Sequence, residues 1–195
     1  YDAGVHLVSF NLKRDTIVQN YHFRKAIYQM INVEKLAKDL EIDVKEASSL
    51  NMELSQPHKK ELEHMELLLK NAGYKGETLN VYCFGHFYGL REGNWLKDEA
   101  RKFGISLSVC PISYHDFVNE PLENEVDILL MGLSLSFDKH LAFSYALQNP
   151  VLLFNRLFSK EIEEYIHHEI RLFELEADKE KRTKLMLQIE RHLQQ

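Results

Sequence analysis

Histidine and cysteine are the residue types in this sequence that could hold a metal ion or carry out nucleophilic chemistry. The chain has 10 histidines, but none has the H-E-x-x-H spacing that places two imidazoles on one helix face. His167 and His168 are adjacent and therefore project from different sides of a helix, and His58 and His64 are also wrongly spaced for one face. No G-x-S-x-G, Walker A or G-x-G-x-x-G motif is present. The residue chemistry thus predicts a protein that is not an enzyme, with no catalytic residues, no metal site and no cofactor.

The two cysteines, Cys83 and Cys110, each lie in an apolar stretch that is typical of a β-strand. Two cysteines at this separation match no zinc-site spacing. We expect two buried thiols. A disulfide between them, and a nucleophilic pair of Cys83 with a histidine, are the alternatives. Unpaired thiols favour a reducing compartment.

Composition and charge exclude several other classes of protein. Of 195 residues, 45% are hydrophobic and 28% charged, which is typical of a globular domain with a core of its own. The net charge of −6 provides no positive field for nucleic-acid phosphates. No apolar run reaches the ~18 residues that a membrane-spanning helix needs. The sequence has no signal-peptide pattern and begins at Tyr1, so we expect a piece cut from a longer polypeptide.

Strands alternate with helices along the chain, and this order predicts a single α/β domain over residues 1–195. Its sheet should be mainly parallel and flanked by helices. Asn32 is expected to cap a helix, residues 41–57 to form a long connection, and 116–118 a short turn. Apolar and alternating runs predict strands at 5–12, 78–84, 105–110 and 126–131. Apolar spacing of three or four predicts helices at about 20–31, 34–40, 62–72, 95–103, 138–147, 159–174 and 178–193, the last two as a C-terminal pair.

Five segments, in order along nearly the whole chain, carry a resemblance. A Phe-Asn strand end precedes an Arg-x-Ala helix, a Leu-Leu helix precedes an Ala-Gly-Tyr turn, and a further helix, turn and strand follow in WLKDEARKFGISLSV. EVDILLMGLSLSFD and the tail EIEEYIHHEIRLFELEADKEKRTKLMLQIERHL complete the series. Together they resemble the family 5 solute-binding proteins of ABC importers, which bind dipeptides and oligopeptides. The matching residues are Phe10, Asn11, Arg24, Ala26, Ile27, Leu68, Leu69, Ala72, Gly73, Tyr74, Phe103, Gly104 and Ile105.

This resemblance implies one lobe, the C-terminal one, of a type II, periplasmic-binding-protein-like clamshell. A small-molecule or peptide ligand would then be shared with a missing N-terminal lobe. Family members often carry Trp and then Asp after the Gly of the fourth segment, and that Asp can pair with a ligand ammonium. Here Leu133 replaces the Trp and Ser136 falls near the Asp. Asp138 either takes the role of that Asp or only caps the next helix.

The resemblance has two branches that differ in cellular role. SgrR-type transcriptional regulators place a DNA-binding domain before a family 5-like region, and the unpaired cysteines and the form FNLKRD…FRKAIYQMIN favour this reading. A regulator would be cytoplasmic, and its contact with DNA would belong to a missing domain. The alternative is the substrate-binding component of an ABC importer, outside the membrane and working with a permease.

Ligands of open α/β sheets bind beyond the carboxyl ends of the strands, where the connecting loops converge. Aromatic walls with a few polar groups suit a small-molecule cleft there. Arg91 either holds a ligand carboxylate or phosphate or is merely solvated near a helix start. The candidate ligand-binding residues are His86, Tyr88, Arg91, Tyr114, Leu133, Ser134, Ser136, Phe137 and Asp138.

Overall fold

The computed structural model describes residues 4–47, 49, 64–134, 139–149 and 152–194. Its strands are β1 (Gly4–Phe10), β2 (Thr78–Phe84), β3 (Ser106–Ile112) and β4 (Ile128–Ser134). Its helices are α1 (Tyr21–Met30), α2 (Val33–Leu40), α3 (Met65–Ala72), α4 (Phe87–Lys102), α5 (Tyr114–Asn119), α6 (Lys139–Gln148), α7 (Leu153–Arg156), α8 (Lys160–Leu175) and α9 (Lys179–Leu193), with 3-10 turns at Ile17–Gln19 and Leu122–Asn124.

The four strands form one sheet in the order β1-β4-β2-β3. β4, β2 and β3 run parallel, whereas β1 lies antiparallel beside β4. The sheet is therefore mainly parallel, as the sequence predicts. The alternation of strands and helices in the sequence did not predict that β1 runs antiparallel to its neighbour.

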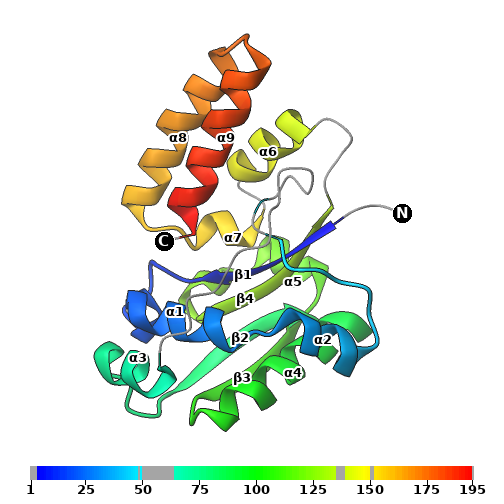
Figure 1. Ribbon diagram of the computed structural model, residues 1–195, viewed down its shortest axis with the longest axis vertical. Coiled ribbons are helices and arrows are strands. Elements are labelled where there is room, and N and C mark those ends of the chain that lie inside the picture. Colours follow the sequence, from blue (N-terminus) through cyan, green and yellow to red (C-terminus); the bar gives the residue numbers. More distant parts are fainter. Residues whose placement is uncertain (1–3, 48, 50–63, 135–138, 150–151, 195) are drawn as a thin grey trace.

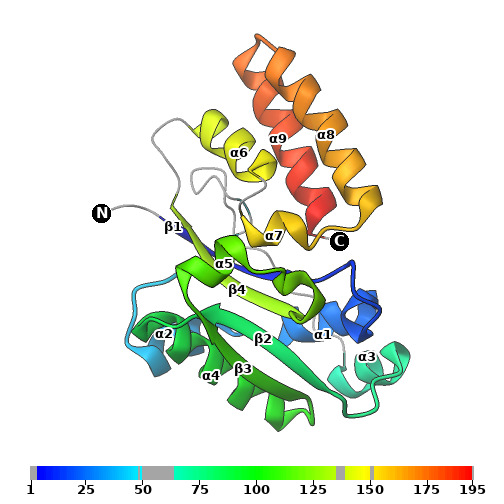
Figure 2. The same cartoon turned by 180° about the vertical axis from the view of Figure 1, so that it is seen from behind.

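Helices cover both faces of the sheet (Figures 1 and 2). One face packs against α1, α2, α3 and α4, and its core includes Phe23, Ile27, Leu79, Trp95 and Ile128. The opposite face packs against α5, α6, α8 and α9, and its core includes Phe117, Leu129, Phe143, Ile170 and Met186. Side chains of successive strand residues alternate between the two cores, because a strand projects them to opposite faces.

The ends of several helices follow local chemistry. The Asn32 side chain accepts a hydrogen bond from the Lys35 amide, which confirms the predicted cap of α2. Gly73 ends α3 at φ 76°, a left-handed conformation that glycine adopts without strain. The C-terminal pair is confirmed as α8 and α9, and Ser159 and Asp178 cap them.

Three predictions about elements are wrong. Residues 116–118 are not a turn but part of α5, whose N-terminus is closed by a capping box of Ser113 and Asp116. α4 begins at Phe87 rather than at about residue 95, so that Gly89 lies inside the helix. Phe103, the last residue of the helix predicted at about 95–103, follows the end of α4 and is 40% exposed, so it does not belong to the buried side of that helix.

The Phe-Asn pair at the end of β1 has a structural role. The Asn11 side chain is fully buried and donates to the carbonyls of Glu123 and Val126, at 2.7 and 2.8 Å. It also accepts a hydrogen bond from the Lys13 amide. Asn11 therefore joins the end of β1 to the segment that leads into β4, since each of these buried polar groups finds a partner.

Candidate functional site

The carboxyl ends of the parallel strands lie at one edge of the sheet, which we call the ligand edge. Phe84, Ile112 and Ser134 are the last residues of β2, β3 and β4. Two helices begin immediately after this edge, α4 with His86 as its cap and α5 with Ser113 as its cap. The antiparallel β1 begins at the same edge, because Gly4 pairs with Ser134.

An aromatic row runs along the ligand edge on the side of α5. We define it as His86, Phe84, Phe117 and Tyr114. The His86 and Phe84 rings are stacked with centroids 5.9 Å apart, and Phe84 lies 5.0 Å from Phe117. Tyr114 stacks on Phe117 at 6.3 Å and is 70% exposed. The row thus provides exposed ring surface on a buried base, which suits packing against an apolar or planar group.

A charged pair, His6 and Glu92, lies near the ligand edge on the other face of the sheet. His6 Nδ1 is 2.9 Å from Glu92 Oε1 and 3.1 Å from Oε2, so the ring nitrogen donates to the carboxylate. His6 stands opposite Gly132 of β4, where the absence of a side chain leaves the imidazole room. The Glu92 side chain is only 18% exposed and that of His6 56%.

The environment of this pair changes the acidity of the histidine. The hydrogen bond to Glu92 raises the pKa of His6 above its ordinary value, and the charge of Glu92 adds to this effect. Partial burial acts in the opposite direction but does not cancel the rise. His6 consequently keeps its proton to a higher pH than a solvated histidine does.

Tyr88 and Arg91 differ in their surroundings. Tyr88 precedes Glu92 by four residues on α4, so the two lie on the same side of the helix, and Tyr88 is 59% exposed. Arg91 is half-buried, and its Nη2 donates to the Leu40 carbonyl at the end of α2, at 2.7 Å. Arg91 is therefore neither merely solvated nor wholly available to a ligand.

The predicted site residues of the third loop are less well placed for binding. Leu133 is 8% exposed and belongs to the core beneath α6 and α8. Ser134 ends β4, and Ser136, Phe137 and Asp138 lie outside the described residues. The structure therefore places His86 and Tyr114 in the aromatic row on the side of α5, and Tyr88 and Arg91 on α4 at the other face of the sheet. It places Leu133 in the core.

The cysteines are free thiols on opposite faces of the sheet. Cys83 pairs with Pro111 and Cys110 with Tyr82, so the two sulfur atoms project in opposite directions. Burial raises the pKa of the Cys83 thiol to about 11, which makes it a poor nucleophile at neutral pH. Cys110 is only partly buried, which corrects the expectation of two buried thiols.

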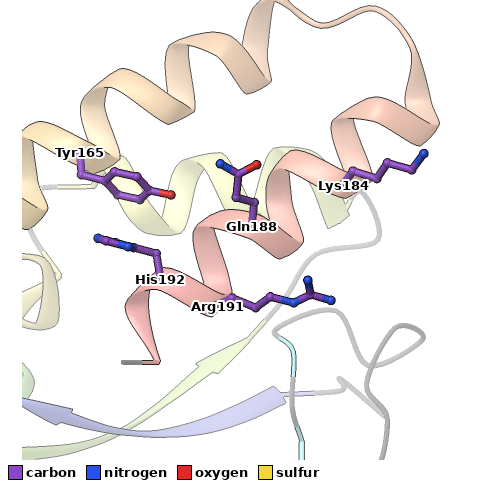
Figure 3. Close-up of a pocket in the computed structure, with 5 residues that line it drawn as sticks. All are labelled: Tyr165, Lys184, Gln188, Arg191 and His192. Atoms are coloured by element: carbon purple, nitrogen blue, oxygen red, sulfur yellow. The ribbon is translucent and has the colours of Figure 1, made fainter. Parts of the chain in front are cut away.

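Other features of the described residues lie apart from the ligand edge. The helical pair carries an open groove of about 520 Å³, lined by Tyr165, Lys184, Gln188, Arg191 and His192 (Figure 3). Within the parts of the chain that the structure describes, no three histidine, cysteine, aspartate or glutamate side chains could together hold a metal ion. Among the same residues, no helix is long and apolar enough to cross a bilayer.

Comparison with known proteins identifies the class of fold. No model of a known protein family matches the chain. The structure is similar to the ABC transporter substrate-binding protein CtaP of Listeria monocytogenes, with a TM-score of 0.74 and 16% identity over 97% of this chain and 41% of that one. It is also similar to a peptide-binding protein of a peptide ABC transporter, with a TM-score of 0.74 and 15% identity over 98% of this chain and 94% of that one.

These similarities show that the chain has the fold of one lobe of a periplasmic-binding-protein-like protein. In sequence, the chain is 25% identical to the uncharacterised protein YhjP of Bacillus subtilis strain 168 over 148 residues. That alignment covers 75% of this chain and 25% of YhjP. The chain thus spans about two fifths of CtaP and a quarter of YhjP.

Proposed function

We propose that the chain is one lobe of a two-lobed solute-binding protein and holds a peptide or other small solute at its ligand edge. The observation that carries this proposal is that the aromatic row and the His6–Glu92 pair lie on the two faces of the sheet near the edge where three parallel strands end. The similarity to CtaP and to a peptide-binding protein supports it. The missing lobe would supply the rest of the contacts.

Removal of an exposed ring from the aromatic row tests this proposal. Calorimetry with trialanine would compare the full protein that carries this chain with its Tyr114→Ala variant. We expect affinity to fall by about tenfold, since stacked aromatic contacts contribute roughly 0.5–1.5 kcal/mol beyond area burial. The matched control is Tyr145→Ala on α6, which removes a ring of similar exposure, 66%. Equal affinity for parent and Tyr114→Ala would place the site elsewhere.

We infer further that the longer protein is a regulator of the SgrR type, in which this lobe senses the solute. YhjP supports this reading by its length: since 148 residues are 25% of it, YhjP has roughly 590 residues. A protein of that length has room for a DNA-binding domain in addition to this lobe and a second one.

The alternative, the substrate-binding component of an ABC importer, fits the solved structures at least as well. The sequence of the full gene product distinguishes the two. A helix-turn-helix before the binding region, and a solute-dependent shift of promoter DNA in an electrophoretic assay, would support the regulator. A signal peptide or lipoprotein cysteine would support the importer.

A further inference from the structure

Among the described residues, the carboxylates of Asp116 and Glu92 lie close to the ligand edge, and they differ in the hydrogen bonds that their oxygens accept. Asp116 accepts hydrogen bonds from both the amide and the hydroxyl of Ser113, and these bonds lower its pKa. Glu92 faces one donor, His6 Nδ1, which lies within 3.1 Å of both of its oxygens. A carboxylate has about four lone-pair positions, so Glu92 has capacity for further donors.

The position of Glu92 limits what those further donors can be. With its side chain 18% exposed, Glu92 is poorly hydrated, and an unneutralised charge in such a place is costly. His6 neutralises it only when the imidazole is protonated. Tyr88, on the same side of α4, adds an exposed ring whose face attracts cations. Carboxylate and ring together favour a positively charged group.

We propose that Glu92, held in place by His6, binds a cationic group of the solute, an amino or guanidinium group, beside the ring of Tyr88. This inference rests on the proposed function of the lobe and names the chemistry of its ligand. The bound cation would take the place of the proton on His6, so that the ion pair with Glu92 passes from imidazolium to ligand.

A pair of peptides that differ only in charge tests the proposal. Trialanine has an ammonium group, whereas N-acetyl-trialanine is neutral at that end. Calorimetry would measure both with the full protein, with Glu92→Gln and with Glu169→Gln. Glu169 is a matched control, because it also lies beside a histidine, His168 at 3.9 Å, but on α8. We expect the parent and Glu169→Gln to prefer trialanine by about tenfold or more, and Glu92→Gln to lose the preference.

The outcomes separate this inference from the proposed function. Equal binding of the two peptides by the parent, or a preference that persists in Glu92→Gln, would overturn the role of Glu92 and leave solute binding intact. Failure of the parent to bind either peptide would count against peptide binding itself and remove the inference with it. If Glu169→Gln also lost the preference for trialanine, the proposal would be contradicted, because the preference would then depend on the net charge of the protein and not on Glu92.

A second test measures the affinity for trialanine as a function of pH in the parent and in His6→Gln. A purely structural role of Glu92 would not make this affinity depend on the protonation of His6. We expect the parent to lose affinity for trialanine as pH falls through the pKa of His6, because the imidazolium then competes for Glu92. Cys83, whose pKa burial raises to about 11, does not change charge in that range. His86, which caps α4, is a second imidazole near this end of the helix, and Arg91 is a further charged group there, so the variant His6→Gln is needed to assign the pH dependence to His6. His6→Gln should abolish the pH dependence, and its persistence would contradict the proposal.

Discussion

The protonation of His6 depends on one carboxylate, and this dependence can be measured without a ligand. Glu92→Gln removes the charge and weakens the hydrogen bond that together raise the pKa of His6. We therefore expect the pKa of His6 to return toward 6.5 in this variant, as followed by NMR of the imidazole nitrogens. An unchanged pKa would mean that another group sets the acidity of His6.

The same pair affects stability in a defined pH range. Because the folded state raises the pKa of His6, protonation stabilises the fold. This stabilisation is fully present below the unfolded pKa of about 6.5 and is lost as pH rises through the folded pKa. Urea midpoints of the parent should therefore fall more between pH 5.5 and 8 than those of Glu92→Gln. Parallel pH profiles of the two proteins would contradict this.

Asn11 has the opposite character, since it is buried and holds the fold rather than a ligand. Asn11→Ala removes the donor to the carbonyls of Glu123 and Val126. We expect a loss of roughly 1–3 kcal/mol in the free energy of unfolding, measured with urea. Asn119→Ala is the control, because Asn119 is exposed and should cost less than about 0.5 kcal/mol. If Asn11→Ala and Asn119→Ala lowered the free energy of unfolding equally, the loss would not depend on the burial of the side chain.

At the scale of elements, α4 lies close to the strand that precedes it. A Cβ added at Gly89 would lie 2.4 Å from the carbonyl oxygen of Phe84, a contact that backbone can relieve only by moving. We expect Gly89→Ala to destabilise the protein by roughly 1–3 kcal/mol in urea unfolding and to displace the start of α4, which carries Tyr88 and Glu92. Gly85→Ala, with a nearest contact of 3.5 Å, should be tolerated. Similar stabilities of the two variants would contradict this account.

Elements were predictable from the sequence where one signal dominated. α8 and α9 combine regular apolar spacing with N-caps, and β2 lies between clear turn residues. α5 was missed because six residues are too few for periodicity, and its capping box alone marks it. The start of α4 was missed because Gly89 lowers helix propensity, while the close approach to Phe84 requires it.

Only those residues of the candidate site that directly follow the end of a strand were predictable from the sequence. His86, Tyr88 and Tyr114 follow strand ends, so the general rule for α/β sheets places them at the ligand edge. His6 and Glu92 are far apart in the chain and meet because β1 joins the sheet in antiparallel direction. No local sequence pattern indicates that direction. The burial of Leu133 follows from strand alternation, which turns its side chain into the core.

At the scale of the whole molecule, one sheet separates two cores and should couple them. Trp95, the single tryptophan, reports the core beneath α4, whereas Met186 lies in the core beneath α9. We expect Met186→Ala to lower the free energy of unfolding by roughly 2–5 kcal/mol. The unfolding midpoints followed by tryptophan fluorescence and by far-UV circular dichroism should shift by the same amount. A shift of the midpoint followed by circular dichroism alone would mean that the two cores unfold separately.

The place of β1 in the sheet has a consequence for synthesis on the ribosome. β1 ends at Phe10, whereas β4, the strand with which it pairs in the described part of the chain, begins at Ile128. At ~5–20 residues per second, roughly 6–24 seconds separate the two strands during translation. β2 and β3 can pair within that time, but the apolar side chains of β1 have no strand to join. The nascent chain therefore exposes the apolar side chains of β1 until β4 has been synthesised, which leaves this segment open to chaperone binding during that interval.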